Sequence, residues 1–166
     1  HTGWHLTLVE QVIEAGYGVV QVMLWTAEEA WADVSGGADM PDDDLLMRRL
    51  AGVLDWVRSQ TAAADTPVVL MASGHAAAAA FKTAAERPAT AAGLITINGR
   101  ANLAQEYMLR VSLPVLMIAG RNDRPAAHAA RFIADRLATA KKIVIMPGVG
   151  RRVDELGAAD EVARLT

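Results

Sequence analysis

Five short, continuous apolar runs constrain the fold of this chain more than any other feature. They are rich in Val, Ile, Leu and Met, and they lie at residues 18–24, 68–72, 94–97, 115–119 and 142–146. Apolar runs that do not alternate with polar residues are typical of strands buried on both faces of a parallel sheet. We therefore predict a mainly parallel sheet of about five strands.

Segments with a helical period separate these runs. Residues 45–57 place Leu, Val and Trp on one stripe, after an acidic start at Asp42-Asp43-Asp44 that favours a helix N-terminus. Residues 76–86 form an alanine-rich helix that Pro88 ends. Further helices are predicted at 6–15, 126–138 and 154–165. Because strand and helix alternate, we predict a doubly wound α/β fold with helices on both faces of the sheet.

Length and composition exclude several classes of protein. A chain of 166 residues that is 52% hydrophobic is expected to form a single domain, residues 1–166, around one core. It contains no cysteine, which excludes disulfides, thiolate zinc sites and thiol nucleophiles. The net charge of −3 argues against an electrostatic nucleic-acid binder. We expect a small molecule or another protein as the partner.

No part of the sequence predicts a membrane-spanning segment, a signal peptide or a metal site. The apolar runs are much shorter than the ~20 residues of a membrane span, and the first residues lack the pattern of a signal peptide. The acidic loop at 32–44 lacks the regular spacing of a calcium loop. The abundance of alanine and the excess of arginine over lysine are typical of GC-rich bacterial genomes. We expect a bacterial, cytoplasmic protein without metal or cofactor.

Polar residues that follow three of the predicted strands indicate where chemistry would occur. In an open α/β sheet, ligands bind beyond the carboxyl ends of the strands. Ser73-Gly74-His75 follows the second apolar run, Gly120-Arg121-Asn122-Asp123 follows the fourth, and Pro147-Gly148-Val149-Gly150-Arg151 follows the fifth.

This arrangement of polar motifs after three strands resembles that of the α/β hydrolases, specifically the small bacterial dienelactone-hydrolase-like group. Some members of that group are fused to phosphoribosyltransferase domains. In that group one strand ends in Gly-x-Ser-x-Gly, a later strand in Gly-Gly-x-Asp, and the last strand in Pro-Gly-x-x-His. The resemblance runs from about Leu8 to Leu165. Its landmarks include Glu14-Ala15-Gly16, Ala85-Glu86-Arg87-Pro88, Asn98-Gly99-Arg100 and Leu113-Pro114-Val115.

The resemblance implies a catalytic triad that this sequence does not complete. The nucleophile position falls on Gly74, the acid position on Asp123, and the base position on Arg151. Glycine offers no side-chain oxygen, and a guanidinium stays protonated in proteins. Gly74 also adopts freely the strained backbone angles that such a turn requires. We therefore expect a non-catalytic homologue that acts as a binding or assembly module.

An active enzyme is the alternative. Ser73 stands one residue before the nucleophile position and His75 one residue after it, so a shifted turn would present a serine with Asp123 and a displaced histidine. However, such a turn projects a single residue, so Ser73 is expected to point away from the cleft.

The same residues form a candidate anion site. The amides of Gly74, His75 and Ala76 open a helix, and helix N-termini attract anions. Arg151 would approach from the opposite side, and Arg100 follows a neighbouring strand. We hypothesise that the site binds a small carboxylate or phosphate. In the alternative interpretation Arg151 simply pairs with Asp123.

The remaining histidines and tryptophans receive structural interpretations. His128 is expected at the surface of a helix, and His1 and His5 are interpreted as a tag remnant or a frayed terminus. The tryptophans at 25, 31 and 56 are expected to cover the core or the rim of the cleft.

The resemblance also implies a strand that the sequence lacks. In the dienelactone-hydrolase-like group an additional strand precedes the helix placed here at 6–15, and the His-Gly loop after it supplies half of the oxyanion hole. Only residues 1–5 precede that helix here, so we expect a sheet trimmed at its N-terminal side. An unpaired sheet edge invites pairing with another chain, and we therefore expect a homo-oligomer or an association with a missing N-terminal segment.

Overall fold

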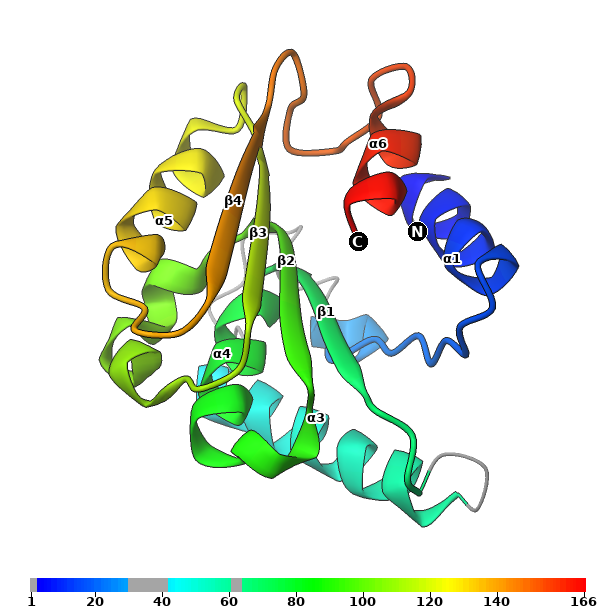
Figure 1. Ribbon diagram of the computed structural model, residues 1–166, viewed down its shortest axis with the longest axis vertical. Coiled ribbons are helices and arrows are strands. Elements are labelled where there is room, and N and C mark those ends of the chain that lie inside the picture. The colour runs from blue at the N-terminus through cyan, green and yellow to red at the C-terminus, as the bar shows by residue number, and fades with distance from the viewer. Residues whose placement is uncertain (1–2, 30–41, 61–63) are drawn as a thin grey trace.

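A parallel sheet of four strands organises the protein (Figure 1). The computed structural model describes residues 3–29, 42–60 and 64–166. The strands are β1 (Val69–Gly74), β2 (Gly93–Gly99), β3 (Val115–Gly120) and β4 (Lys141–Met146), in the spatial order β1-β2-β3-β4. The last four of the five predicted strands are therefore confirmed.

Helices cover both faces of the sheet, which confirms the doubly wound α/β fold. The helices are α1 (Gly3–Glu14), α3 (Asp43–Ser59), α4 (Ala76–Glu86), α5 (Arg124–Ala134) and α6 (Ala158–Leu165), with 3-10 turns η1 (Pro88–Thr90) and η2 (Ala101–Arg110). On the first face α4 and α5 contact the strands, α3 packs on α4, and η2 packs on both α4 and α5. On the second face α1 and α6 lie side by side over Ile95, Ile97 and Ile118. Among the described residues no helix is both long and apolar enough to cross a membrane.

Small residues let α4 approach the sheet closely. Ala77, Ala78 and Ala79 are fully buried. A Cβ atom built on Gly99 of β2 would lie only 2.6 Å from the Cβ atom of Ala77. The alanine run of α4 is therefore a packing surface, and the helix ends at Glu86, as the following Arg87-Pro88 predicts.

The acidic start predicted for α3 is confirmed as a helix cap. The Asp42 carboxylate accepts a hydrogen bond of 2.6 Å from the backbone N–H of Leu45. This bond satisfies one of the free amides of the first turn. The earlier part of the predicted acidic loop, residues 32–41, lies outside the described residues.

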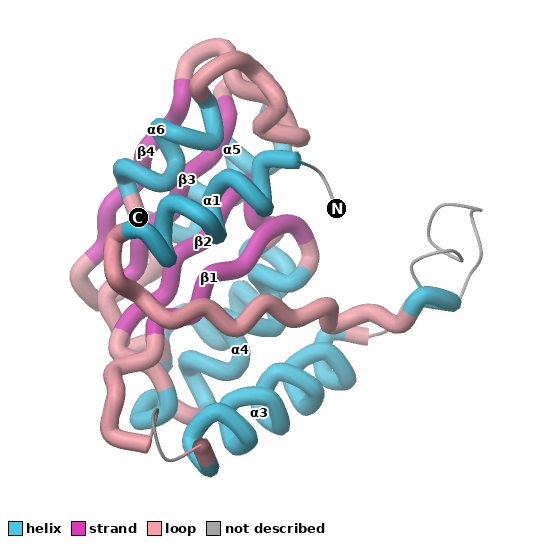
Figure 2. Tube along the Cα trace, turned by 90° about the vertical axis from the view of Figure 1, so that its right-hand side faces the viewer, coloured by secondary structure: helices cyan, strands magenta, loops and turns pink. Residues whose placement is uncertain are grey.

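The prediction of a strand at residues 18–24 is wrong. These residues run as extended coil past β1 without joining the sheet, as Figures 1 and 2 show. Val20 and Met23 expose 53% and 65% of their surface. A strand is stable only when a neighbour pairs with its backbone, and within the described residues this segment has none.

Both ends of that segment are nevertheless fixed. The backbone N–H of Tyr17 donates to the carbonyl oxygen of Val12 in α1. Arg49 of α3 donates to the carbonyl oxygen of Leu24 at 2.7 Å and forms a two-pronged ion pair with Glu29 at 2.6 and 2.8 Å. The hydrogen bond from the Arg49 guanidinium to the Glu29 carboxylate lowers the pKa of Glu29 from its ordinary 4.5 to about 2.

Candidate functional site

Gly74 forms the sharp turn between β1 and α4. Its φ is +56°, the left-handed region that glycine enters without strain. Its carbonyl oxygen accepts a 2.9 Å hydrogen bond from the backbone N–H of Arg100. A Cβ atom built on Gly74 meets nothing within 4 Å. The turn therefore projects into open space but carries no side chain, and the expected left-handed glycine is confirmed.

Ser73 lies next to His5, for which the sequence predicts no role in the site. Its Oγ atom is 3.5 Å from the Nε2 atom of His5, which belongs to α1. The His5 ring stacks on Trp4 with centroids 3.7 Å apart. The distance is at the upper limit of a hydrogen bond. The interpretation of His5 as a frayed terminus is thus wrong, because it lies in a helix and reaches the edge of the site.

His75 and Arg100 meet at the start of α4. The Nη1 atom of Arg100 is 3.3 Å from the Nε2 atom of His75. The ring of Trp25 lies 5.8 Å from the His75 ring, measured between centroids. Trp25 therefore lies at the rim of the site, as expected. Trp56 instead is 55% exposed on α3, away from the core, and Trp31 lies outside the described residues.

Asp123 and Arg151 follow the ends of β3 and β4. Asp123 caps α5, where its Oδ1 atom accepts a hydrogen bond of 3.2 Å from the N–H of Ala126. Arg151 is exposed in a turn after β4. In the described parts of the chain no ion pair joins the two. The alternative in which Arg151 pairs with Asp123 is therefore wrong.

Asn98 links three parts of the site by hydrogen bonds, a role that the sequence pattern does not predict. Its side chain accepts a hydrogen bond from the N–H of Gly120 at 2.8 Å. It donates to the carbonyl oxygens of Gly150 and Arg151 at 2.9 and 3.2 Å. Asn98 is 7% exposed with φ +47°, an angle that asparagine tolerates better than most residues. It therefore holds the Arg151 turn against β2 and β3.

Tight packing and a carboxylate fix the same turn from other sides. A Cβ atom built on Gly120 would lie 2.3 Å from the carbonyl oxygen of Val149, so only glycine allows this approach. The Oε1 atom of Glu155 accepts a hydrogen bond of 2.6 Å from the N–H of Gly150. Its Oε2 atom is buried without a partner in the described structure. The position of Arg151 is thus set by several buried contacts.

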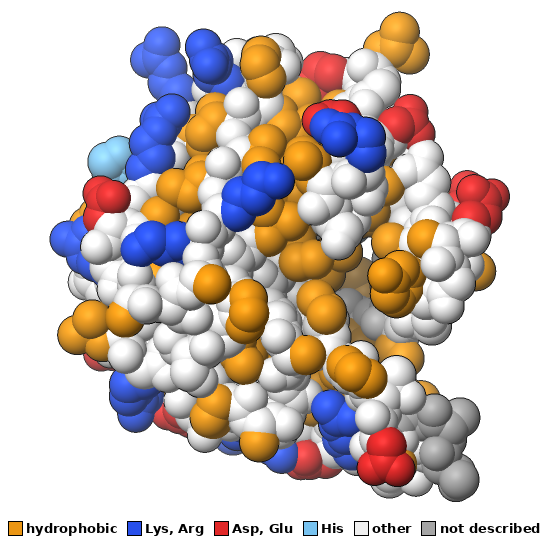
Figure 3. All heavy atoms as spheres, in the orientation of Figure 1, with side chains coloured by type: hydrophobic (Ala, Val, Ile, Leu, Met, Phe, Trp, Pro, Cys, Tyr) orange, Lys and Arg blue, Asp and Glu red, His pale blue; other side chains and the backbone are white. Residues whose placement is uncertain are grey.

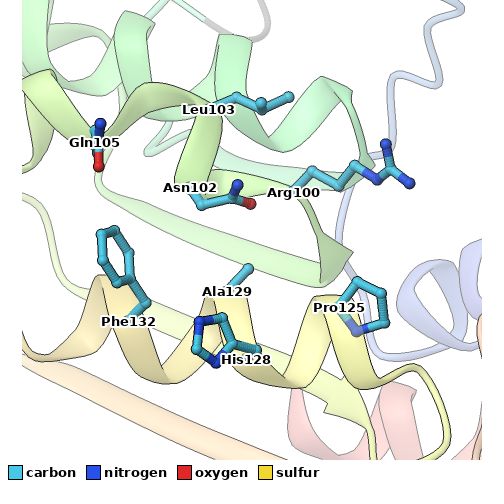
Figure 4. Close-up of a pocket in the computed structure, with 8 residues that line it drawn as sticks. All are labelled: Arg100, Asn102, Leu103, Gln105, Pro125, His128, Ala129 and Phe132. Carbon is cyan, nitrogen blue, oxygen red and sulfur yellow. The ribbon is translucent and has the colours of Figure 1, made fainter.

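A groove of about 440 Å³ lies between η2 and α5, next to Arg100. Figure 4 shows its lining from both elements, with Phe132 of α5 pointing toward Gln105 of η2. The lining residues are Arg100, Asn102, Leu103, Gln105, Pro125, His128, Ala129 and Phe132. His128 is exposed, as expected, and also lines this groove. Within the described ranges no group of three or more His, Cys, Asp or Glu residues is placed to hold a metal ion.

The comparisons with known proteins agree with this architecture. No protein-family model matches the chain. Two curated proteins of Mycobacterium tuberculosis, from strains CDC 1551 and H37Rv, are named as phosphoribosyl transferases. Each is 26% identical over 158 residues, which are 95% of this chain and 35% of the relative. The chain thus spans about a third of the length of the curated relatives it matches.

Solved structures are similar over nearly the whole chain. A dienelactone hydrolase from Anabaena variabilis superposes with a TM-score of 0.90 and 29% identity, covering 99% of this chain and 76% of that one. An α/β serine hydrolase homologue from Coxiella burnetii gives 0.72 with 16% identity, covering 99% and 74%. A monoacylglycerol lipase from Paleococcus ferrophilus gives 0.76 with 13% identity, covering 99% and 87%. The chain therefore has the α/β-hydrolase fold and resembles the dienelactone hydrolases among the proteins that share it.

Proposed function

We propose that this chain is a ligand-binding homologue of the α/β hydrolases that does not hydrolyse esters by their usual mechanism. The observation that carries the proposal is Gly74, which stands at the projecting position of the strand-to-helix turn with open space around it. Acyl transfer needs an attacking oxygen and a base that accepts its proton. Glycine supplies no oxygen, and the guanidinium of Arg151 cannot accept a proton.

The ligand proposed for this site is a small carboxylate or phosphate. The amides that open α4 lie at the positive end of its dipole. Arg100 contacts His75 at the start of that helix, which adds a cationic side chain beside these amides. The exposed Arg151 supplies a second guanidinium on a turn that Asn98 holds in place. Guanidinium groups and helix amides together favour an anion.

Calorimetric titration with acetate, benzoate and inorganic phosphate tests this proposal. We expect heat of binding for at least one of these anions, and a loss of affinity on the order of tenfold or more in Arg100→Ala or Arg151→Ala, as for removal of a charged partner. Arg152→Ala is the matched control, because Arg152 is an exposed arginine in the same turn. Absence of binding, or equal losses in all three variants, contradicts the proposed site.

The contact between His5 and Ser73 favours a second candidate, a residual serine hydrolase. In that reaction the Nε2 atom of His5 takes the proton of the Ser73 hydroxyl, 3.5 Å away, while the oxygen attacks an ester carbonyl. The ester C–O bond then breaks, and the alcohol leaves with the proton that His5 returns. A fluorophosphonate probe distinguishes the two candidates, because an activated serine attacks its phosphorus and releases fluoride. We expect no labelling. Stoichiometric labelling that disappears in both Ser73→Ala and His5→Gln would replace the binding proposal with the enzyme.

The mycobacterial relatives are named as phosphoribosyl transferases, but this chain matches only 35% of their length. We propose that the domain acts as a binding or assembly module.

A further inference from the structure

Positive charge is concentrated in residues 121–142, which form α5 and the start of β4. This stretch carries six Lys and Arg residues against two acidic residues, a net charge of +4. The chain has a net charge of −3, so all other residues together carry −7. Figure 3 shows Lys and Arg side chains gathered on the side of the molecule where Figure 1 places α5. The six cations are Arg121, Arg124, Arg131, Arg136, Lys141 and Lys142.

These cations have no partner of opposite charge. All six are exposed, and none of them forms an ion pair with any residue that the structure describes. Arg136 and Lys141 donate hydrogen bonds only to the carbonyl oxygens of Phe132 and Leu137. The carboxylate of Asp123 accepts its hydrogen bond from the backbone of α5. The positive charge on this side of the molecule is therefore available to a partner.

Helix stability does not explain the cations at the start of α5. The helix begins at Arg124, where its free N–H groups and its dipole make the end of the helix positive. A cation at this end is electrostatically unfavourable, whereas the dipole favours Arg131 in the last turn. Arg121 lies just before the same positive end. A negatively charged partner would offset the repulsion that these two arginines meet.

One face of α5 presents the charges to the solvent. Arg124, His128 and Arg131 are exposed, and their spacing places them on the same face of the helix. The alanines of the opposite face are buried against the rest of the protein. The helix α1, in which the described chain begins, packs on the other face of the sheet. The three side chains thus form a cationic stripe on the outside of α5.

An apolar groove lies beside this stripe. Its volume is about 440 Å³, and Figure 4 shows Ala129 and Phe132 of α5 pointing toward η2. Pro125 and Leu103 complete its apolar lining, and Leu103 exposes 45% of its surface. The guanidinium carbon of Arg136 lies 3.5 Å from the centroid of the Phe132 ring. A cation therefore covers one face of this ring at the rim of the groove.

We infer that the cationic stripe and the apolar groove beside it bind an acidic segment of a partner protein that carries one apolar anchor residue. The carboxylates of the segment contact Arg124 and Arg131, because guanidinium groups bind carboxylates in two-pronged geometry and clusters of arginine recognise acidic motifs. The apolar side chain of the segment enters the groove, where its burial adds affinity.

The observations favour a protein partner over a nucleic acid. Arg136 already covers one face of the Phe132 ring, so the groove offers no open aromatic platform on which a base could stack. The charge of −7 on the other residues repels a long phosphate backbone, whereas an acidic segment contacts α5 alone. The inference does not depend on the proposed anion site, because the stripe and the apolar lining include neither Arg100 nor Arg151.

Fluorescence anisotropy with a short labelled peptide of glutamates around a central leucine gives the first test. We expect saturable binding to the wild type at low ionic strength. Arg124→Glu combined with Arg131→Glu is expected to lose affinity on the order of tenfold or more, because charge reversal replaces attraction by repulsion. Arg48→Glu combined with Arg152→Glu is the matched control, because it changes the net charge equally at exposed arginines outside the stripe. Absence of saturable binding overturns the inference, as do equal losses in the two double variants.

Arg124→Glu alone separates binding from folding. An acidic residue in the first turn of a helix is favoured by the dipole, so this variant does not lose affinity through a weaker α5. Its affinity for the leucine peptide is expected to fall on the order of threefold or more, and circular dichroism verifies that it is folded. An affinity equal to that of the wild type overturns the inference.

Two further probes test the groove and the class of partner. A peptide with serine in place of the leucine is expected to bind the wild type several-fold more weakly, and Leu103→Ser is expected to remove this difference between the peptides. Equal affinities of the two peptides for the wild type, or a difference that persists in Leu103→Ser, overturn the role of the groove. A labelled single-stranded DNA oligonucleotide of the same net charge is expected to bind on the order of tenfold more weakly than the leucine peptide at the same ionic strength. Equal or tighter binding of the oligonucleotide overturns the protein partner.

Discussion

At the scale of single residues, Gly74 has a left-handed backbone conformation and open space where a side chain would project. At φ +56° and with open space around its Cβ direction, a side chain there meets a conformational penalty and no clash. Gly74→Ser is therefore expected to lower the free energy of unfolding by about 1 to 2 kcal/mol. Urea unfolding measures this loss. Gly148→Ser is the matched control, because Gly148 has φ +76° and equally open space; a loss at Gly74 well above that control would reveal an unrecognised contact.

At Asn98 the free energy contributed by the side-chain hydrogen bonds can be separated from the free energy cost of backbone strain. Asn98→Ala removes three hydrogen bonds and leaves a residue with a Cβ atom at φ +47°. We expect a loss of about 3 kcal/mol in the free energy of unfolding, from unpaired buried groups and strain together. Asn98→Gly removes the same bonds without the strain and is expected to cost about 1 kcal/mol less. Urea titrations of the three proteins give both differences, and equal losses in Ala and Gly would refute the assignment of strain.

At the scale of elements, the ion pair between Glu29 and Arg49 lies near the end of the extended coil at residues 18–24 and anchors it to α3. Because the pKa of Glu29 is lowered to about 2, the stability that this pair contributes is present above its ordinary pKa of 4.5 and is lost as the pH falls toward 2. The melting temperature of Glu29→Gln is therefore expected to lie below that of the wild type at pH 7 and to converge with it near pH 2. Thermal melts across this range are the measurement. Glu28→Gln is the control, because Glu28 forms no ion pair among the described residues; a gap that persists at pH 2 would contradict the electrostatic cause.

The elements also show what the sequence can and cannot predict. The runs that became β2 and β3 were predictable because both faces of these strands are buried, with Leu94, Val115 and Met117 nearly inaccessible. The runs of β1 and β4, at the two edges of the sheet, are more exposed but are equally continuous in apolar residues. The run at 18–24 has the same composition but remains coil, because pairing depends on a neighbour and not on the segment itself. The helix expected at 154–165 begins only at Ala158, after Gly157 in a left-handed conformation.

The candidate site was only partly predictable for a related reason. Gly74, Asp123 and Arg151 follow strand ends, and topology alone brings parallel strand ends to one edge. His5 and Ser73 are separated by 68 residues, and no local pattern predicts that contact. Asn98 was visible as a polar residue at the end of an apolar run, but its three partners come from two other elements. Long-range partners of this kind require the packed structure.

At the scale of the whole molecule, the sheet separates two cores of unequal size. The larger core joins β1, β2 and β3 with α3, α4, α5 and η2. The smaller one joins α1 and α6 to one face of the sheet and to the turn after β4. A layer with few buried residues opens at a lower free energy than the rest of a protein. We therefore expect α1 and α6 to open together, because they pack on each other.

Hydrogen exchange of Val162→Ala tests this cooperative opening. Val162 of α6 is fully buried in the smaller core, and its truncation is expected to destabilise the layer by about 2 kcal/mol. Exchange measured by mass spectrometry should become faster in peptides of both α1 and α6, while peptides of β2 and α4 keep their protection. Ile133→Val in the larger core is the matched control, because Ile133 is equally buried and its truncation should act through global unfolding alone. If α6 loses protection while α1 keeps it, the two helices do not open as one cooperative unit.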